Sequence, residues 1–185
     1  MSSGGMVFKQ FLALVATLAM GLINGLRADE VPFAYQKIAL ENGLPAPLFY
    51  AVALTESGQS GLSQNQFRPW PWTLNVSGQG LYFPSRKAAW LALQRALDSD
   101  ESSVDIGLMQ VNWRYHQKDL GSAWRSLDPY HNLRVGAAIL RRCYLTEADW
   151  WASLGCYHAP GNPVKAARYR EQVKGHWRKL TEEHS

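Results

Sequence analysis

Residues 47–58 read Pro-Leu-Phe-Tyr-Ala-Val-Ala-Leu-Thr-Glu-Ser-Gly, an apolar run that ends in a carboxylate and a glycine. Pro47 suits the first turn of a helix, because the N–H that proline lacks would have no partner there. One apolar face then repeats at helical spacing through Leu48, Ala51, Val52 and Thr55. The sequence therefore predicts a helix over 47–55, with Glu56 where this helix meets a loop.

Glu56 is a candidate general acid because of this position. A carboxyl group beside apolar surface is poorly hydrated in its charged form, so its pKa rises and it can hold a proton near neutral pH. A solvated glutamate at a helix end is the alternative interpretation of the same residue.

The rest of the chain is predicted to be mainly α. Further helices are expected over 34–43, 86–97, 105–112, 131–145, 147–158 and 163–177. Ser85 is a plausible N-cap for the helix over 86–97. Residues 72–76 and 81–83 flank the glycine-bearing segment 77–80, which predicts a hairpin with a four-residue turn. This hairpin is the only β-structure that the sequence predicts.

The first 28 residues are typical of an export signal. Lys9 precedes a nearly uninterrupted apolar run over 11–26, and Ala28 suits the position before cleavage. The alternative is an uncleaved membrane anchor, since the run is only slightly shorter than a membrane span. Cleavage would leave residues 29–185 as one domain in the periplasm.

The overall charge does not favour a nucleic-acid-binding protein. The formal charge is +4, and loss of Lys9 and Arg27 with the signal would lower it by two. The last predicted helix is basic, with Lys165, Arg168, Arg170, Lys174, Arg178 and Lys179 against Glu171. A nucleic-acid surface is one interpretation of that helix. A solvated face, or contact with a carboxylate-rich polymer outside the cytoplasm, agrees better with an exported protein.

The two cysteines, Cys143 and Cys156, predict a disulfide, because a cysteine pair in an exported protein is normally oxidised. Neither a CxxC nor an HExxH motif occurs among the cysteines and the five histidines. No metal site and no cofactor are therefore predicted.

Four blocks of sequence follow one another along the chain. They are ALTESG at 53–58, DIGLMQVN at 105–112, NLRVGAAIL at 132–140 and CYHAPGNP at 156–163. Together, in this order and at these spacings, they resemble the catalytic domain of the soluble lytic transglycosylases, which is itself similar to goose-type lysozyme. The resemblance covers about residues 34–175. It implies a single lysozyme-like helical domain with a small β-hairpin insertion.

The resemblance also implies roles for individual residues. Glu56 would be the sole catalytic carboxylate, and Tyr157 would donate a hydrogen bond to it. Ser57, Met109, Gln110 and His158 would lie at the sugar-binding cleft. Asn132, Leu133 and Gly136 would be mostly structural.

The chain departs from the family pattern in the last block. His158 stands where the family usually has Asn, and Pro160 where it has Gly. Either a contact with substrate or a bond to a backbone group would account for His158. The Trp-rich segment 67–83 resembles insertions in specialised transglycosylases that accompany conjugation or secretion machinery.

Lytic transglycosylases need only one carboxylate, whereas ordinary glycosidases use two. By resemblance, Glu56 would protonate the glycosidic oxygen between N-acetylmuramic acid and N-acetylglucosamine. It would then accept the proton of the muramyl 6-hydroxyl as a 1,6-anhydro ring closes. Asp98 and Asp100 are interpreted as solvated loop charges and Asp105 as a helix N-cap. A goose-type muramidase and an inactive sugar-binding scaffold protein are the alternatives.

Overall fold

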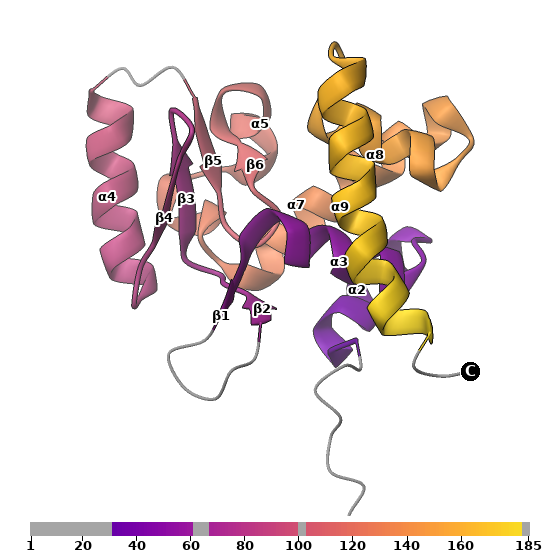
Figure 1. The fold of residues 1–185 in the computed structure, drawn as a ribbon. Helices are drawn as coiled ribbons and strands as arrows, with labels where there is room; N and C mark the ends of the chain where they lie inside the picture. Colours follow the sequence, from indigo (N-terminus) through magenta and orange to yellow (C-terminus); the bar gives the residue numbers. More distant parts are fainter. Residues whose placement is uncertain (1–30, 61–66, 100–102, 183–185) are drawn as a thin grey trace, which may run out of the picture. The chain divides into compact units, whose positions relative to one another are not determined.

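Two consecutive helices begin the described part of the chain, and Gly43 and Pro45 lie between them. In the computed structural model, which describes residues 31–60, 67–99 and 103–182, α2 spans Phe33–Asn42 and α3 spans Ala46–Ser57 (Figure 1). Gly43 ends α2 in the left-handed conformation, with a φ of 63°, which glycine adopts without steric cost. Eight of the twelve residues of α3 are buried, including all of 48–54, so this helix lies in the core. Both predicted helices are confirmed.

A four-stranded antiparallel sheet forms a second part of the fold. Its strands lie in the order β4-β3-β5-β6. Their bounds are Thr73–Val76 for β3, Gln79–Tyr82 for β4, Val104–Ile106 for β5 and Val111–Asn112 for β6. The predicted hairpin is β3–β4, but the four-residue turn was wrong: Val76 pairs with Gln79, so the turn is Ser77-Gly78. Both turn residues have positive φ values, 50° and 92°, as two-residue hairpin turns require.

The helix predicted over 105–112 is also wrong. This segment contains β5, a turn over 107–110 and β6. Buried Val104, Ile106 and Val111 alternate with more exposed neighbours, which is the two-residue period of a strand. Asp105 therefore lies in a strand and caps no helix. Asn112 caps the next helix instead, since its Oδ1 accepts the N–H of Arg114 at 3.1 Å.

A second, two-stranded sheet was not predicted either. Strand β1 spans Gly58–Ser60 and pairs in antiparallel with β2, Phe67–Pro69. The hairpin is therefore not the only β-structure. The domain is nevertheless mainly α, as predicted, because helices make up most of its residues.

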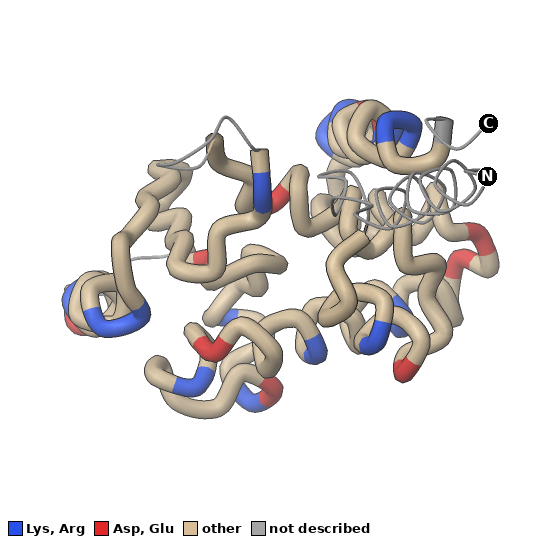
Figure 2. The backbone as a smooth tube through the Cα atoms, turned by 90° about the horizontal axis from the view of Figure 1, so that it is seen from below, with Lys and Arg blue, Asp and Glu red and all other residues tan. Residues whose placement is uncertain are grey.

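Four of the remaining helices follow the sequence prediction closely. They are α4 (Arg86–Asp98), α7 (Pro129–Glu147), α8 (Trp150–His158) and α9 (Pro163–Glu182). The short helices α5 (Trp113–Leu120) and α6 (Ala123–Ser126) were not predicted. Ser85 caps α4 as expected, accepting the Ala88 N–H at 3.2 Å. Helices α4 and α5 lie beside the sheet, whereas α3, α8 and α9 pack together (Figure 1). Basic positions recur along α9 (Figure 2).

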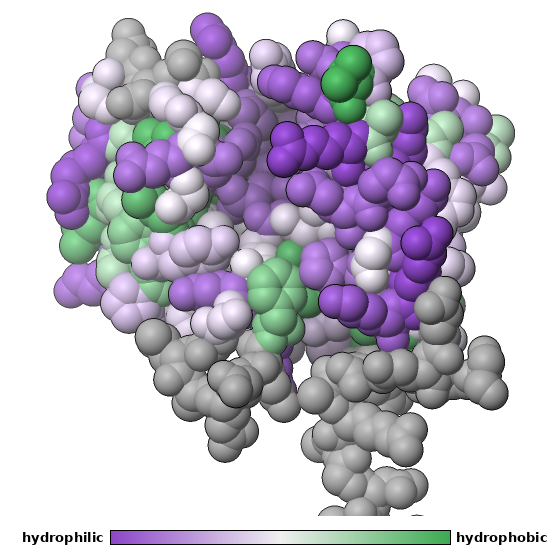
Figure 3. All heavy atoms as spheres, in the orientation of Figure 1, coloured by the Kyte–Doolittle hydropathy of each residue, from purple (hydrophilic) through white to green (hydrophobic). Residues whose placement is uncertain are grey.

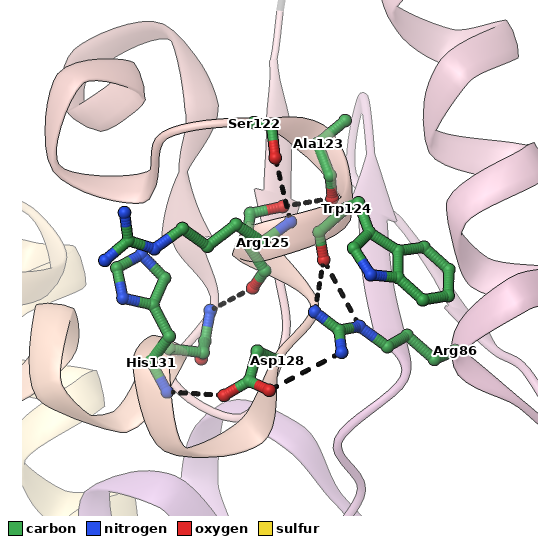
Figure 4. A network of polar contacts seen from close by, with 9 residues as sticks. Arg86, Ser122, Ala123, Trp124, Arg125, Asp128 and His131 are labelled. Atoms are coloured by element: carbon green, nitrogen blue, oxygen red, sulfur yellow. Dashed lines mark hydrogen bonds and ion pairs between the residues drawn. The ribbon is translucent and has the colours of Figure 1, made fainter.

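One polar network fastens α4 to the start of α7 (Figure 4). The Arg86 guanidinium donates to the Trp124 carbonyl at 2.7 Å and lies 4.4 Å from the centre of the Trp124 ring. It also pairs with Asp128 Oδ2 at 3.5 Å, while Asp128 Oδ1 accepts the His131 N–H at 2.9 Å. Asp128 therefore caps α7 and connects it to α4, the helix beside the sheet.

The predicted disulfide is confirmed and joins α7 to α8. Cys143 and Cys156 are bonded, with their Cα atoms 5.7 Å apart and a sequence separation of 13. Closing a ring of this size stabilises a fold by roughly 3 kcal/mol in the chain-entropy model. The bond fixes the end of α8, where Tyr157 and His158 lie.

Within the part of the chain that the structure describes, no helix combines the length and the apolar character needed to cross a membrane. The predicted signal over 1–28 and Asp100 lie outside the described residues.

Candidate active site

Glu56 lies in the last turn of α3, where the helix passes directly into β1. Gly58 makes this junction possible, because a Cβ atom there would overlap the Phe67 ring and the Leu54 carbonyl. The Glu56 side chain is only 11% exposed. The junction thus places a carboxyl group at the edge of the core with little contact to water.

Tyr169 of α9 is the hydrogen-bond donor to this carboxyl group. Its hydroxyl lies 2.6 Å from Glu56 Oε1, and the residue is 2% exposed. The bond predicted from Tyr157 was wrong, since the Tyr157 hydroxyl donates to the Met109 carbonyl at 2.7 Å. Sequence reasoning missed Tyr169 because it lies outside the four blocks. Its spacing with buried Ala166 and Val173 could have shown that it faces the core, where a tyrosine hydroxyl needs a partner.

His158, the last residue of α8, completes the group around Glu56. Its ring is parallel to that of Tyr169, with centroids 4.1 Å apart and an interplanar angle of 1°. Nδ1 lies 3.9 Å from Glu56 Oε1, and 41% of the side chain is exposed. Burial, followed by the nearby charge of Lys165, lowers the pKa of His158 below its ordinary value. The ring is therefore neutral near neutral pH, and its approach to Glu56 is a polar contact between uncharged groups.

The electrostatic environment keeps Glu56 protonated near neutral pH. Burial raises the pKa of Glu56 to about 8, against the hydrogen bond from Tyr169, which lowers it. The charge of Asp105 raises the same pKa further. Burial and then the charge of Glu56 raise the pKa values of Tyr157 and Tyr169, so both phenols are neutral donors. The site can therefore present a carboxylic acid, not a carboxylate, to a ligand.

Ser57 and Met109 are structural in this fold. Ser57 is fully buried, and its Oγ donates to the Leu108 carbonyl at 2.8 Å, which ties α3 to the 107–110 turn. Met109 is also fully buried and packs against Gly136, where a Cβ atom would lie 2.5 Å from the Met109 Cβ. These burials contradict the prediction that the two side chains lie at the sugar-binding cleft.

Gln110 is partly exposed at the end of the same turn. Its Nε2 donates to the Gly107 carbonyl at 2.9 Å and to the Thr73 carbonyl at 3.3 Å, and its backbone has a φ of 43°. These bonds hold the side chain in one place. A contact between Gln110 and substrate stays a prediction, as does one between His158 and substrate.

Asn132 of α7, which is 1% exposed, holds the 107–110 turn in place through side-chain hydrogen bonds. Its Oδ1 accepts the Met109 N–H at 2.9 Å, and its Nδ2 donates to the Ile106 carbonyl at 2.8 Å and the Ser126 carbonyl at 3.2 Å. Gly107, with a φ of 79°, leaves room for this amide, since a Cβ atom there would lie 2.6 Å from Asn132 Cγ. The structural role predicted for Asn132 agrees with these contacts.

Figure 3 shows a hollow in the surface between the part that carries the sheet and the part that carries α9, with hydrophilic side chains along its α9 border. Across residues 31–60, 67–99 and 103–182, no group of three or more His, Cys, Asp or Glu side chains is placed to hold a metal ion.

The raised pKa of Glu56 predicts a stability that falls as the pH rises. The carboxyl group ionises near its ordinary value of 4.5 in the unfolded chain, but only near 8 in the fold. Between these values the folded state binds the extra proton, so each pH unit removes about 1.4 kcal/mol from the free energy of unfolding. This contribution is complete below 4.5 and is lost as the pH passes 8.

We therefore expect Glu56→Gln to gain stability relative to the wild type as the pH is raised from about 5 to about 9. Urea unfolding of both proteins across this range measures the difference. Parallel stability curves would contradict a buried, protonated Glu56.

Comparison with known proteins gives one match. The family model described as the transglycosylase SLT domain matches residues 33–179, which include α2 to α8 and nearly all of α9. Among curated proteins and among solved structures, no match to the chain was found.

Proposed function

The chain belongs to the transglycosylase SLT domain family, and from this premise we propose that it is a peptidoglycan lytic transglycosylase with Glu56 as its acid and base. Family membership assigns it transglycosylase-type activity on peptidoglycan in general. The proposal adds the bond cleaved, the product and the residue that does the chemistry.

One observation carries the proposal: Glu56 is a nearly buried carboxyl group that keeps its proton up to about pH 8. Such a group can donate to the oxygen of the β-1,4 bond between N-acetylmuramic acid and N-acetylglucosamine. The bond from the anomeric carbon to that oxygen breaks as the proton arrives. The muramyl 6-hydroxyl oxygen then bonds to the anomeric carbon, and its proton passes to the Glu56 carboxylate. Glu56 is thereby restored, and the product is a 1,6-anhydro ring.

Tyr169 supports both halves of this cycle. Its hydroxyl donates a hydrogen bond to Glu56 Oε1 at 2.6 Å, so the acidic proton of Glu56 is directed to Oε2. The same hydrogen bond stabilises the carboxylate once the proton has left, because bonds to a charged acceptor are the stronger kind. The family resemblance places Tyr157 near the carboxyl group. We propose that Tyr157 acts indirectly, because its hydrogen bond to the Met109 carbonyl keeps the 107–110 turn in place.

Export to the periplasm, after cleavage of residues 1–28, is part of the proposal, because peptidoglycan lies there. An association with a conjugation or secretion complex also stays a proposal. Its basis is the Trp-rich segment 67–83, which forms β2, β3 and β4.

Asp105 gives specific support to a second candidate, a muramidase that hydrolyses the same bond with water. This residue lies in β5 close enough for its charge to raise the pKa of Glu56. Asn112 Nδ2 donates to its Oδ1 at 2.7 Å and fixes the carboxyl group. Two carboxyl groups, one acid and one base, are what a hydrolytic glycosidase uses.

Product analysis separates the two candidates. Purified sacculi are digested with the wild type and with Asp105→Asn, and the soluble fragments are identified by mass spectrometry. The transglycosylase predicts 1,6-anhydromuramic ends, lighter by one water than hydrolytic ends, from both proteins. It also predicts that Asp105→Asn loses less than about tenfold in rate, because general bases typically contribute about 10²–10⁴-fold and Asp105 would not be one.

The muramidase predicts the opposite pattern, with reducing ends from the wild type and a loss of about 10²-fold or more in Asp105→Asn. Asp119→Asn is the matched control, because Asp119 is an exposed aspartate that pairs with Arg142 at 3.3 Å. An intact protein that binds sacculi and releases neither product would identify the inactive scaffold.

A further inference from the structure

His158 differs from the other residues around Glu56 because it is both exposed and titratable. Tyr169 is buried and Tyr157 is partly buried, whereas 41% of the His158 side chain contacts solvent. Its ring lies flat on Tyr169, and the Tyr169 hydroxyl is bonded to Glu56. A change in the position of the His158 ring would therefore affect Glu56 in two ways. One is through the stacked Tyr169 ring, and the other is through His158 Nδ1.

The first route is mechanical. A phenol ring held by one neighbour can rotate its hydroxyl away from a hydrogen-bond partner, but a parallel ring 4.1 Å away restricts that movement. The stack thus keeps the Tyr169 oxygen on Glu56 Oε1, and it keeps the acidic proton on the other carboxyl oxygen.

The second route is electrostatic. His158 Nδ1 lies 3.9 Å from Glu56 Oε1, about 1 Å beyond hydrogen-bond distance. When Glu56 gives up its proton, a buried carboxylate forms that needs further donors. A small approach of the ring would let Nδ1–H donate to it in addition to Tyr169.

We propose that His158 is a positioning residue for Glu56, which holds the Tyr169 hydroxyl in place through the ring stack and donates from Nδ1 to the Glu56 carboxylate as it forms. This inference rests on the proposed function of Glu56. An asparagine at 158, the residue usual in the family, could donate a hydrogen bond but could not titrate, so histidine makes the site sensitive to acid.

The charged and titratable groups around His158 determine the sign of this sensitivity. Glu56 faces it from α3, Tyr169 and Lys165 from α9, and Asp105 of β5 acts on it through Glu56. Lys165 and burial oppose the charged imidazolium. Once acid has protonated His158, the adjacent positive charge weakens Glu56 as the base of the second step. Turnover should therefore fall on the acid side, below the ordinary histidine pKa.

Three substitutions separate the two routes. His158→Phe keeps a flat ring for the stack but removes the nitrogen, His158→Asn keeps a donor but removes the ring, and His158→Ala removes both. For His158→Phe we expect kcat to fall by about 10–100-fold, as for one hydrogen bond to a charged group, with KM nearly unchanged. His158→Ala should lose more than His158→Phe. The acid limb of the kcat profile should disappear in all three.

A measurement that does not need turnover tests the stack separately. The hydrogen bond from Tyr169 lowers the pKa of Glu56, so Tyr169→Phe should raise the titration midpoint of this carboxyl group, read by carbon NMR. His158→Phe, which loses the Nδ1 donor to the carboxylate, should also raise the midpoint, and His158→Ala, which loses the ring stack as well, should raise it further.

The proposal is overturned if His158→Ala retains the wild-type kcat and acid limb, or if its loss is entirely in KM, which would indicate a substrate contact. Equal Glu56 midpoints in His158→Ala and His158→Phe overturn the stack route. The product analysis keeps a failure of the proposed function distinct: reducing ends, or no product, from the wild type would refute the transglycosylase while the Glu56 midpoints still report on His158.

Discussion

Glu56→Gln is expected to remove nearly all glycan-cleaving activity while leaving the fold intact. Glutamine can neither donate the proton that the leaving oxygen needs nor accept the one from the 6-hydroxyl. General acid–base groups contribute about 10²–10⁴-fold each, and here one side chain serves both steps, so we expect a loss of at least about 10⁴-fold in kcat. The measurement is the release of soluble fragments from purified sacculi.

Two comparisons make this result specific to the carboxyl proton. Glutamine keeps an oxygen that can accept the Tyr169 hydroxyl, so the circular dichroism spectrum and sacculus binding should match the wild type. Glu171→Gln, at an exposed glutamate of α9 that pairs with Lys174 at 2.8 Å, should retain full activity. Wild-type turnover in Glu56→Gln would refute the assignment of Glu56 altogether.

Asn132→Leu is expected to be the most destabilising of the substitutions considered. Leucine is similar in size but makes none of the three hydrogen bonds of the Asn132 side chain, and it leaves one buried N–H and two carbonyls without that partner. An unsatisfied buried polar group costs about 1–3 kcal/mol, which predicts a loss of about 3–6 kcal/mol in the free energy of unfolding. Because small domains are stable by only about 5–15 kcal/mol, this loss could unfold much of the protein.

Urea unfolding compares Asn132→Leu with the wild type. The matched control is Asn162→Ala, at an exposed asparagine whose Oδ1 accepts the Lys165 N–H at 3.0 Å near the start of α9. Loss of such a cap costs about 1 kcal/mol. Equal losses in the two variants would mean that burial of Asn132 adds nothing to its hydrogen bonds.

Helices α2, α3, α4, α7, α8 and α9 were predictable because their signals are local, whereas the short helices α5 and α6 were not predicted. The left-handed glycine after α2, the proline in the first turn of α3 and the caps of α4 and α7 each act within a few residues. The apolar spacing of α3 also located Glu56 at its end. Signals of this kind are properties of neighbouring residues, so one sequence contains them in full.

The conformation of residues 107–110 (GLMQ) was mispredicted because it depends on residues that are distant in sequence. Its turn is fixed by Asn132, from a helix more than twenty residues further along the chain, and by Ser57, fifty-one residues before Leu108. Short-range spacing alone could not distinguish a helical turn from two short strands held in this way. The same non-local bonds explain why Ser57 and Met109 are buried and do not line a cleft.

The partner of Glu56 could not be predicted for a similar reason. Both Tyr157, which is partly buried, and Tyr169, which is buried, lie near the carboxyl group, and the family resemblance pointed to Tyr157. The choice between them depends on how α8 and α9 pack on α3, which the spacing of residues within one helix does not contain.

The bond between Tyr169 and Glu56 also joins residues 113 positions apart, one in the second described helix and one in the last. During synthesis α3 leaves the ribosome long before α9 is made, so Glu56 is present in the chain before its partner Tyr169. Contacts this distant in sequence are costly in chain entropy and form late in folding. A nascent or truncated chain that ends before α9 therefore carries Glu56 without its hydrogen-bond donor, and the candidate active site is complete only in the whole domain.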